Sequence, residues 1–176
     1  MNSILIPLDG SEFSAQILDA VKKFFAPNAS ALVLYRVGAP AEGFTGTPPR
    51  PAAPGVNVAM YETGQDAELA HHPIYVSQEE DSRVSALADG LESLAQSLRA
   101  AGYSVTVEAD LGNAAEAIVE RARANDIDLI AMTTHGRSGI SRLLFGSVAE
   151  QIVRHVTIPV LLLRPSASSD GESNAV

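Results

Sequence analysis

The segment from Thr133 to Val148, T-T-H-G-R-S-G-I-S-R-L-L-F-G-S-V, combines glycines with arginines in a pattern that suits phosphate recognition. These residues are Gly136, Arg137, Gly139, Arg142 and Gly146. Glycine lets backbone N–H groups approach an anion because no Cβ stands in the way. Gly146 and Ser147 fall at a predicted helix start, where unpaired N–H groups and the helix dipole favour negative charge. The alternative is that the glycines only turn the chain and Ser147 only caps its helix.

This segment differs from the commonest phosphate-binding loops. Neither G-x-x-x-x-G-K-[ST] nor G-x-G-x-x-G occurs in the chain. Both lysines, Lys22 and Lys23, lie in the first predicted helix and far from the glycines. No set of nucleophile, base and orienting group is visible near the loop either, so the sequence predicts binding and names no catalytic residue.

Charge is unevenly distributed along the chain, whose 176 residues carry a net charge of −9. Residues 62–128 hold four arginines against fourteen acids, whereas residues 129–165 hold four arginines against one acid. The acidic total argues against a protein that coats nucleic acid or an anionic membrane. A small anion needs only a local site, and the basic segment contains the candidate phosphate loop.

Composition excludes several other classes of protein. The chain has no cysteine, so disulfides, thiolate zinc sites and cysteine nucleophiles are excluded. No apolar run approaches the ~20 residues of a membrane span, and Pro7 and Asp9 interrupt the first apolar run before it resembles a signal peptide. We therefore expect a cytoplasmic protein. His71 and His72 are adjacent but lack further ligands, so they indicate a metal site only weakly.

Short apolar runs alternate with helical periods, which predicts how the candidate residues are positioned. Strands are predicted at 3–8, 31–37, 104–109, 129–133 and 159–163. Helices are predicted after Ser11 up to Pro27, from about Glu80 to Gly102, from Asn113 to about Ala124, and from Ser147 to about His155. Asn113 with Glu116, and Ser147 with Glu150, have the spacing of capping boxes.

This alternation predicts an α/β fold, with one doubly wound, Rossmann-like sheet of five parallel strands and helices on both faces. In such sheets ligands bind beyond the carboxyl ends of the strands, where the strand order reverses. With the order 3-2-1-4-5, the reversal would bring Asp9 close to the residues from Met132 to Gly136.

Residues 38–79 interrupt the alternation. They hold six of the ten prolines and five of the thirteen glycines, without sustained periodicity. We expect an insertion loop here that either has a function or is mobile. We also expect residues 166–176, which are small and polar, to be disordered beyond a single domain at 1–165.

Two motifs make the chain similar to the universal stress protein family over roughly residues 1–165. The family's nucleotide-binding members carry G-x-x-G, nine residues and G-[ST]. Here Gly136, nine residues and Gly146-Ser147 reproduce the second half, while Thr133 stands where the family has its first glycine. The run H-G-R-S-G-I-S-R-L-L-F-G-S-V-A-E-Q-I-V-R-H and the opening I-L-I-P-L-D-G-S-E also resemble the family.

The resemblance implies that the protein binds ATP or AMP, with Mg²⁺ accompanying ATP. Asp9, preceded by Pro7 and Leu8, would contact the adenosine, and a carboxylate suits ribose hydroxyls. The alternative role of Asp9 is a turn residue before Gly10. Further nucleotide-binding residues that the resemblance implies are Val37, Met132, Thr133, His135, Gly136, Arg137, Gly139, Gly146, Ser147 and Val148.

The last predicted strand would form an edge of the sheet. Its run P-V-L-L-L is apolar, and an exposed apolar edge promotes association unless it is covered. As the resemblance implies, a homodimer would cover it through Ile158, Val160, Leu161, Leu162 and Leu163. Three functions remain open: a dimeric stress-response module that signals through a protein partner, a slow ATP-hydrolysing enzyme, and a dimeric scaffold that binds no nucleotide.

Overall fold

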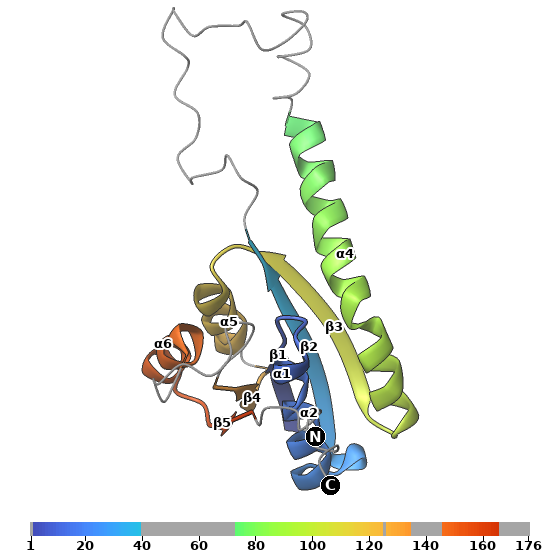
Figure 1. Ribbon diagram of the computed structural model, residues 1–176, viewed down its shortest axis with the longest axis vertical. Helices are drawn as coiled ribbons and strands as arrows, with labels where there is room; N and C mark the ends of the chain where they lie inside the picture. The colour runs from blue at the N-terminus through green and yellow to red at the C-terminus, as the bar shows by residue number, and fades with distance from the viewer. Residues whose placement is uncertain (1, 40–72, 125, 135–145, 166–176) are drawn as a thin grey trace, which may run out of the picture.

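A computed structural model describes residues 2–39, 73–124, 126–134 and 146–165 of the chain. Its centre is a five-stranded parallel sheet with the order β3-β2-β1-β4-β5 (Figure 1). The strands are β1 Asn2–Pro7, β2 Ser30–Gly38, β3 Ser104–Leu111, β4 Leu129–Thr133 and β5 Val160–Leu163. The predicted fold class and strand order are therefore confirmed, and each strand end lies within two residues of its predicted position.

Helices cover both faces of this sheet. They are α1 Glu12–Ala15, α2 Ile17–Phe24, α4 Pro73–Ala100, α5 Ala114–Arg123 and α6 Ser147–His155, with a short 3₁₀ turn at Pro27–Ala29. In Figure 1, α5 and α6 lie on one side of the sheet, and α4 runs along β3 on the other. None of the helices in the described ranges is both long and apolar enough to cross a membrane.

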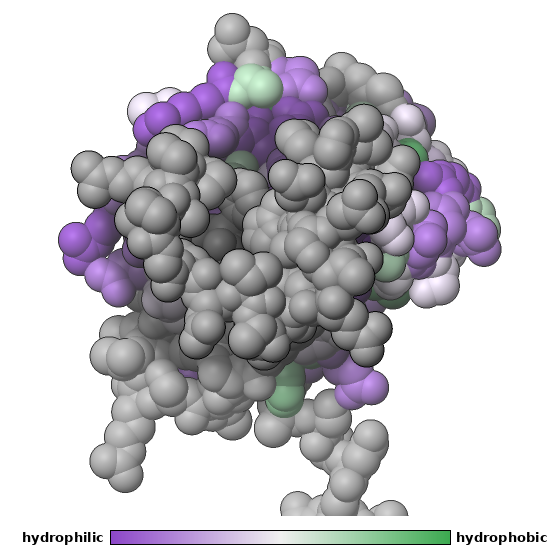
Figure 2. Space-filling view, turned by 90° about the horizontal axis from the view of Figure 1, so that it is seen from above, coloured by the Kyte–Doolittle hydropathy of each residue, from purple (hydrophilic) through white to green (hydrophobic). Residues whose placement is uncertain are grey.

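Alternate residues of each strand supply two separate cores. Leu5, Val33 and Ile130 face α5 and α6, where Ile118 and Ile152 meet them. The neighbouring strand residues pack on the other face against α2 and α4, in a cluster that includes Ile4, Ile6, Leu34, Ile17, Val21, Leu91 and Leu98. Burial on both faces explains why the strands read as continuous apolar runs. Hydrophilic residues predominate on the described part of the end seen in Figure 2.

The pairing between β1 and β4 is short, and this opens the sheet at its carboxyl edge. These two strands pair at Ile4–Leu129 and Leu5–Ile130, whereas β1 pairs with β2 as far as Pro7. Peptide groups alternate in direction along a strand, and Leu8 N–H donates to Tyr35 O on β2 at 2.8 Å. The peptide nitrogen of residue 7 therefore faces β4, where Pro7 has no N–H to donate.

Helix boundaries depart from the predictions at three points. The helix expected from about Glu80 begins at Pro73, so the end of the expected 38–79 loop is helical. Proline is favoured in the first turn because its missing N–H would lack a helical partner anyway. The helix after Ser11 is divided into α1 and α2 at Gln16. The predicted caps Ser11 and Asn113 are confirmed, with Ser11 Oγ accepting from Ser14 N–H at 3.1 Å.

The third departure is at α6, where the predicted Ser147 cap is wrong. Gly146 is the N-cap, and Ser147 is the first residue of the helix. The N–H of Gly146 donates to Thr134 O at 2.6 Å, which holds residue 146 in an extended conformation at the end of β4. Glu150 forms an ion pair with Arg154 at 2.7 Å. The helix therefore starts one residue earlier than a Ser147 cap would require.

Candidate functional site

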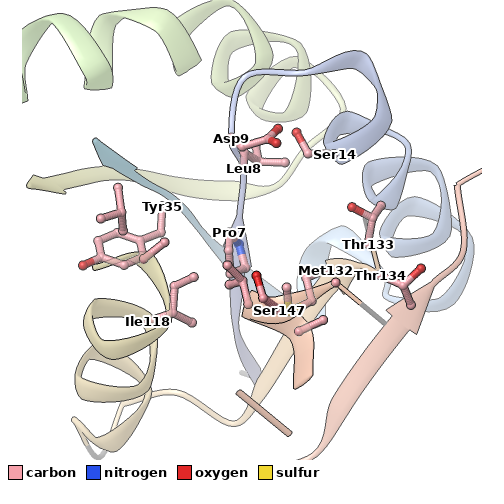
Figure 3. Close-up of a pocket in the computed structure, with 15 residues that line it drawn as sticks. Pro7, Leu8, Asp9, Ser14, Tyr35, Ile118, Met132, Thr133, Thr134 and Ser147 are labelled. Atoms are coloured by element: carbon pink, nitrogen blue, oxygen red, sulfur yellow. The ribbon is translucent and has the colours of Figure 1, made fainter. Parts of the chain in front are cut away.

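A cavity of about 310 Å³ opens at the carboxyl edge of the sheet, where the strand order reverses between β1 and β4. Its wall combines strand ends with helix residues (Figure 3). The lining residues are Pro7, Leu8, Asp9, Ser14, Tyr35, Val37, Ala114, Ile118, Met132, Thr133, Thr134, Gly146, Ser147, Val148 and Ala149. The cavity thus lies where parallel α/β sheets place their ligands.

The nucleotide-binding residues predicted from the sequence all line this cavity where the structure describes them. Pro7, Leu8 and Asp9 come from the end of β1, and Val37 comes from β2. Further lining residues come from β4 and from the start of α6: Met132, Thr133, Gly146, Ser147 and Val148. The other predicted residues, His135, Gly136, Arg137 and Gly139, lie outside the described ranges, as do His71 and His72.

Asp9 combines a turn role with a place in the cavity wall. Its Oδ1 accepts hydrogen bonds from Ser11 N–H at 2.9 Å and from Ser11 Oγ at 2.6 Å. Between them, Gly10 has a φ of +82°, which glycine adopts without strain. Two hydrogen bonds hold the carboxylate in place at the rim. The turn function left open from the sequence is therefore present, and it positions Asp9 in the wall (Figure 3).

The N-terminus of α6 provides the positive end of the cavity. Gly146, Ser147, Val148 and Ala149 all line the cavity, and they form the N-cap and first turn of the helix. First-turn N–H groups have no acceptor within their own helix, and the helix dipole adds partial positive charge. The N–H of Gly146 is taken by Thr134 O, so the donors available to a ligand follow it in sequence. This end of the cavity is suited to an anion.

Sequence reasoning missed several residues of the wall: Ser14, Tyr35, Ala114, Ile118, Thr134 and Ala149. Tyr35 had a signal, because strand residues two apart share a face and Val37 was already predicted. No sequence pattern indicated Ser14 or Ile118, since only the packing of their helices against the sheet brings them to the cavity. In Figure 3, Tyr35 and Ile118 lie on one side of the cavity, and Thr133 and Thr134 lie on the opposite side. Thr133 is 6% exposed, so its side chain is buried in the fold.

Metal ligands are not gathered in the described residues, which contain no cluster of three or more His, Asp or Glu side chains suited to a metal ion. The most tightly linked charges lie elsewhere. Arg121 of α5 contacts Glu108 of β3 at 2.6 Å and Asp126 at 2.8 Å, which ties α5 to the edge of the sheet. The Arg121 guanidinium lowers the pKa of the Asp126 carboxyl, and its pairing with these acids raises the pKa of Arg121 itself.

Tyr35 has an unusual electrostatic environment. It is 3% exposed, and its hydroxyl donates to Asp110 Oδ2 at 3.0 Å. Burial, followed by the hydrogen bond to Asp110, raises the pKa of the Tyr35 phenol well above its ordinary value of 10. Both effects favour the neutral phenol, which keeps this side of the cavity uncharged.

We expect Tyr35 to make the stability of the protein pH-dependent in alkali. Because its pKa is raised by folding, its contribution is complete below pH 10 and is lost as the pH rises above 10. Above pH 10 the slope it adds approaches about 1.4 kcal/mol per pH unit. Urea unfolding at pH 8.5 and 11 should show a smaller loss of stability in Tyr35→Phe than in the wild type. Equal losses in both proteins would contradict this role.

Comparison with known proteins agrees with this arrangement. Residues 1–164 match the profile of the universal stress protein family. The chain belongs to the universal stress protein family. As a family member, it is 45% identical over 67 residues to the universal stress protein Slr1230 of Synechocystis. That match covers 38% of this chain and 23% of the relative, so the matched segment spans less than a quarter of that protein's length.

Solved structures show that this universal stress protein shares its fold with other members. The structure of the hypothetical protein MJ0577 of Methanocaldococcus jannaschii has a TM-score of 0.69 at 22% identity, covering 95% of this chain and 98% of that one. A universal stress protein in complex with cAMP has a TM-score of 0.56 at 20% identity, covering 94% and 98%. A family member from Arabidopsis thaliana with AMP bound has 0.55 at 13% identity, covering 98% and 97%.

Proposed function

We propose that this universal stress protein binds an adenine nucleotide, ATP or AMP, in the cavity at the carboxyl edge of the sheet. One observation carries the proposal: the N-terminus of α6 and the Asp9 carboxylate both line a cavity whose remaining wall is largely apolar. An anion-binding end, an acceptor for hydroxyl groups and an apolar surface are what phosphate, ribose and base require in turn. The solved relatives that hold cAMP and AMP support the same ligand class.

Each part of the nucleotide has a matching part of the cavity. The base would pack among Val37, Ile118 and Met132, which offer apolar surface. Asp9 would accept hydrogen bonds from the ribose hydroxyls. The phosphates would lie at Gly146, Ser147 and Val148, where the first-turn N–H groups can donate to them. Where ATP is bound, Mg²⁺ would reach the protein with the nucleotide.

Calorimetric titration tests this proposal directly. Purified protein, freed of bound nucleotide, is titrated with ATP, with AMP and with cAMP, each with and without Mg²⁺. We expect saturable one-site binding of an adenine nucleotide. Absence of binding by every adenine nucleotide would overturn the proposal and favour a scaffold that works without nucleotide.

We propose further that the protein is a homodimer formed through β5, acting as a signalling module toward a protein partner. β5 pairs with β4 alone in the described sheet, and its four residues are all partly exposed. On its inner side, Pro159 O and Leu163 O accept from Ile130 N–H and Thr134 N–H. By alternation, the peptide groups of Val160 and Leu162 point away from β4, so a second copy of β5 could pair with them.

Substitution of Leu162 by proline should therefore break the dimer. Leu162→Pro removes an outward N–H, whereas Leu162→Ala loses similar packing and keeps that N–H. In multi-angle light scattering, we expect the wild type and Leu162→Ala at twice the chain mass of 18.4 kDa, and Leu162→Pro at the monomer mass. A monomeric wild type at micromolar concentration would contradict dimer formation, and a dimeric Leu162→Pro would place the interface elsewhere.

A further inference from the structure

A second cavity lies beside the first, and the two share Asp9 and Val37. It has a volume of about 450 Å³ and opens between the end of β2, the end of β3 and α4. Its lining residues are Asp9, Arg36, Val37, Gly38, Ala39, Arg83, Ala86, Leu87 and Leu111. A ligand group leaving the first cavity past Asp9 would enter this second one.

The guanidinium of Arg36 lies close to two glycines in this second cavity. Arg36 points to the α4 side of the sheet, because its neighbours Tyr35 and Val37 face the first cavity. A Cβ added at Gly10 would lie 2.6 Å from Arg36 Nη2, and one added at Gly90 would lie 2.6 Å from Nη1. Glycine inside a helix is less stable than alanine. Gly90, in the middle of α4, therefore gives this guanidinium its space.

Arg36 is partly buried, yet it makes no hydrogen bond or ion pair with a residue in the ranges that the structure describes. Arg83 lines the same cavity, and its Nη2 donates to Ala39 O at 3.0 Å. Two guanidinium groups against the single Asp9 carboxylate leave the cavity positively charged. Guanidinium is suited to phosphate, because its planar fork of donors can bind two phosphate oxygens at once.

We infer that this cavity binds a phosphate carried on the ribose 2′ or 3′ oxygen of the nucleotide. The inference rests on the proposed function, because Asp9 lines both cavities and is the residue proposed to contact the ribose. Dinucleotide-binding α/β folds provide a precedent, because an arginine near the ribose accommodates its 2′-phosphate in some of them. Arg36 lies two residues before the end of β2, where it pairs in register with Ala109 of β3, and Arg83 of α4 is the second cation.

Calorimetry with four ligands tests the inference: adenosine 5′-phosphate, adenosine 2′,5′-bisphosphate, adenosine 3′,5′-bisphosphate and inorganic phosphate. We expect one of the bisphosphates to bind about 10- to 100-fold more tightly than adenosine 5′-phosphate, the range of a charge-assisted contact. Arg36→Met should reduce that preference to less than about threefold while leaving the affinity for adenosine 5′-phosphate within about twofold. Arg83→Gln should also reduce the preference for the bisphosphate. This variant tests the inference if Arg36→Met does not fold.

Arg123→Met is the matched control, since Arg123 is an exposed arginine on α5 outside both cavities. It should keep the full preference. Equal affinity for all three nucleotides, or a preference that survives both Arg36→Met and Arg83→Gln, would overturn the inference. A third result would also overturn the inference: inorganic phosphate binds tightly and Arg36→Met abolishes this binding, but the protein shows no preference among the nucleotides. The cavity would then bind phosphate that is not attached to a ribose. If adenosine 5′-phosphate itself does not bind, the proposed function fails first.

Discussion

Gly146→Asp should weaken the binding of ATP by on the order of 100-fold or more. The substituted carboxylate would stand at the N-cap of α6, at the end of the cavity proposed for the phosphates. Two unit charges about 4 Å apart interact by roughly 4 kcal/mol at an effective dielectric of 20, the value typical near a protein surface. Like charges at that distance repel, so much of the attraction from the helix N-terminus would be cancelled.

The fold itself should tolerate this substitution. Gly146 has φ −70° and ψ 157°, which any residue adopts, and its hydrogen bond to Thr134 uses only the backbone N–H. Aspartate is also among the preferred N-cap residues, so the helix should be at least as stable as before. A loss of binding without a loss of thermal stability would therefore report on the phosphate site alone.

Gly146→Asn separates charge from size. Asparagine has nearly the shape of aspartate and caps helices equally well, but it carries no charge. In calorimetric titrations with ATP, we expect Gly146→Asn to keep an affinity within about tenfold of the wild type. Equal losses in both variants would assign the effect to bulk at position 146. Unchanged binding in Gly146→Asp would place the phosphates away from α6.

Asp9→Ala should lower the affinity for ATP by about 10- to 100-fold, the range for hydrogen bonds to a charged group. The carboxylate lines both cavities, at the point proposed for the ribose hydroxyls. The sharper test pairs this variant with 2′-deoxy-ATP and 3′-deoxy-ATP. The wild type should bind at least one of these deoxynucleotides more weakly than ATP, and Asp9→Ala should bind all three alike.

Ser11→Ala is the control for the turn that Asp9 also supports. It removes the hydroxyl that donates to Asp9 Oδ1 and the cap of α1, while the carboxylate stays in place. We expect it to cost about 1 kcal/mol of stability and to keep the discrimination against deoxynucleotides. If Ser11→Ala also loses that discrimination, Asp9 acts through the turn. If the wild type does not discriminate, the ribose lies elsewhere.

Sequence patterns were sufficient wherever the decisive interactions are local. Asn113 at a helix start and apolar runs at each strand act through neighbouring residues, so their positions follow from composition and spacing. The capping-box spacing of Ser147 and Glu150 gave a wrong prediction, because the N-cap position depends on how residue 146 is held at the end of β4. A hydrogen bond between Gly146 and Thr134, twelve positions apart, moved the helix start by one residue.

The sequence by itself determined that five apolar strands alternate with helices and that the cavity residues from Pro7 to Asp9 and from Gly146 to Val148 follow strands or open a helix. Only the tertiary structure decided which helices complete the wall. Ile118 reaches the cavity because α5 packs on the face of the sheet that Val37 shares, and Gly90 meets Arg36 because α4 packs on the opposite face. Such contacts depend on the strand order and on how the helices pack against the sheet. Each contact joins residues far apart in the sequence, so a short stretch of sequence contains only one of the two partners.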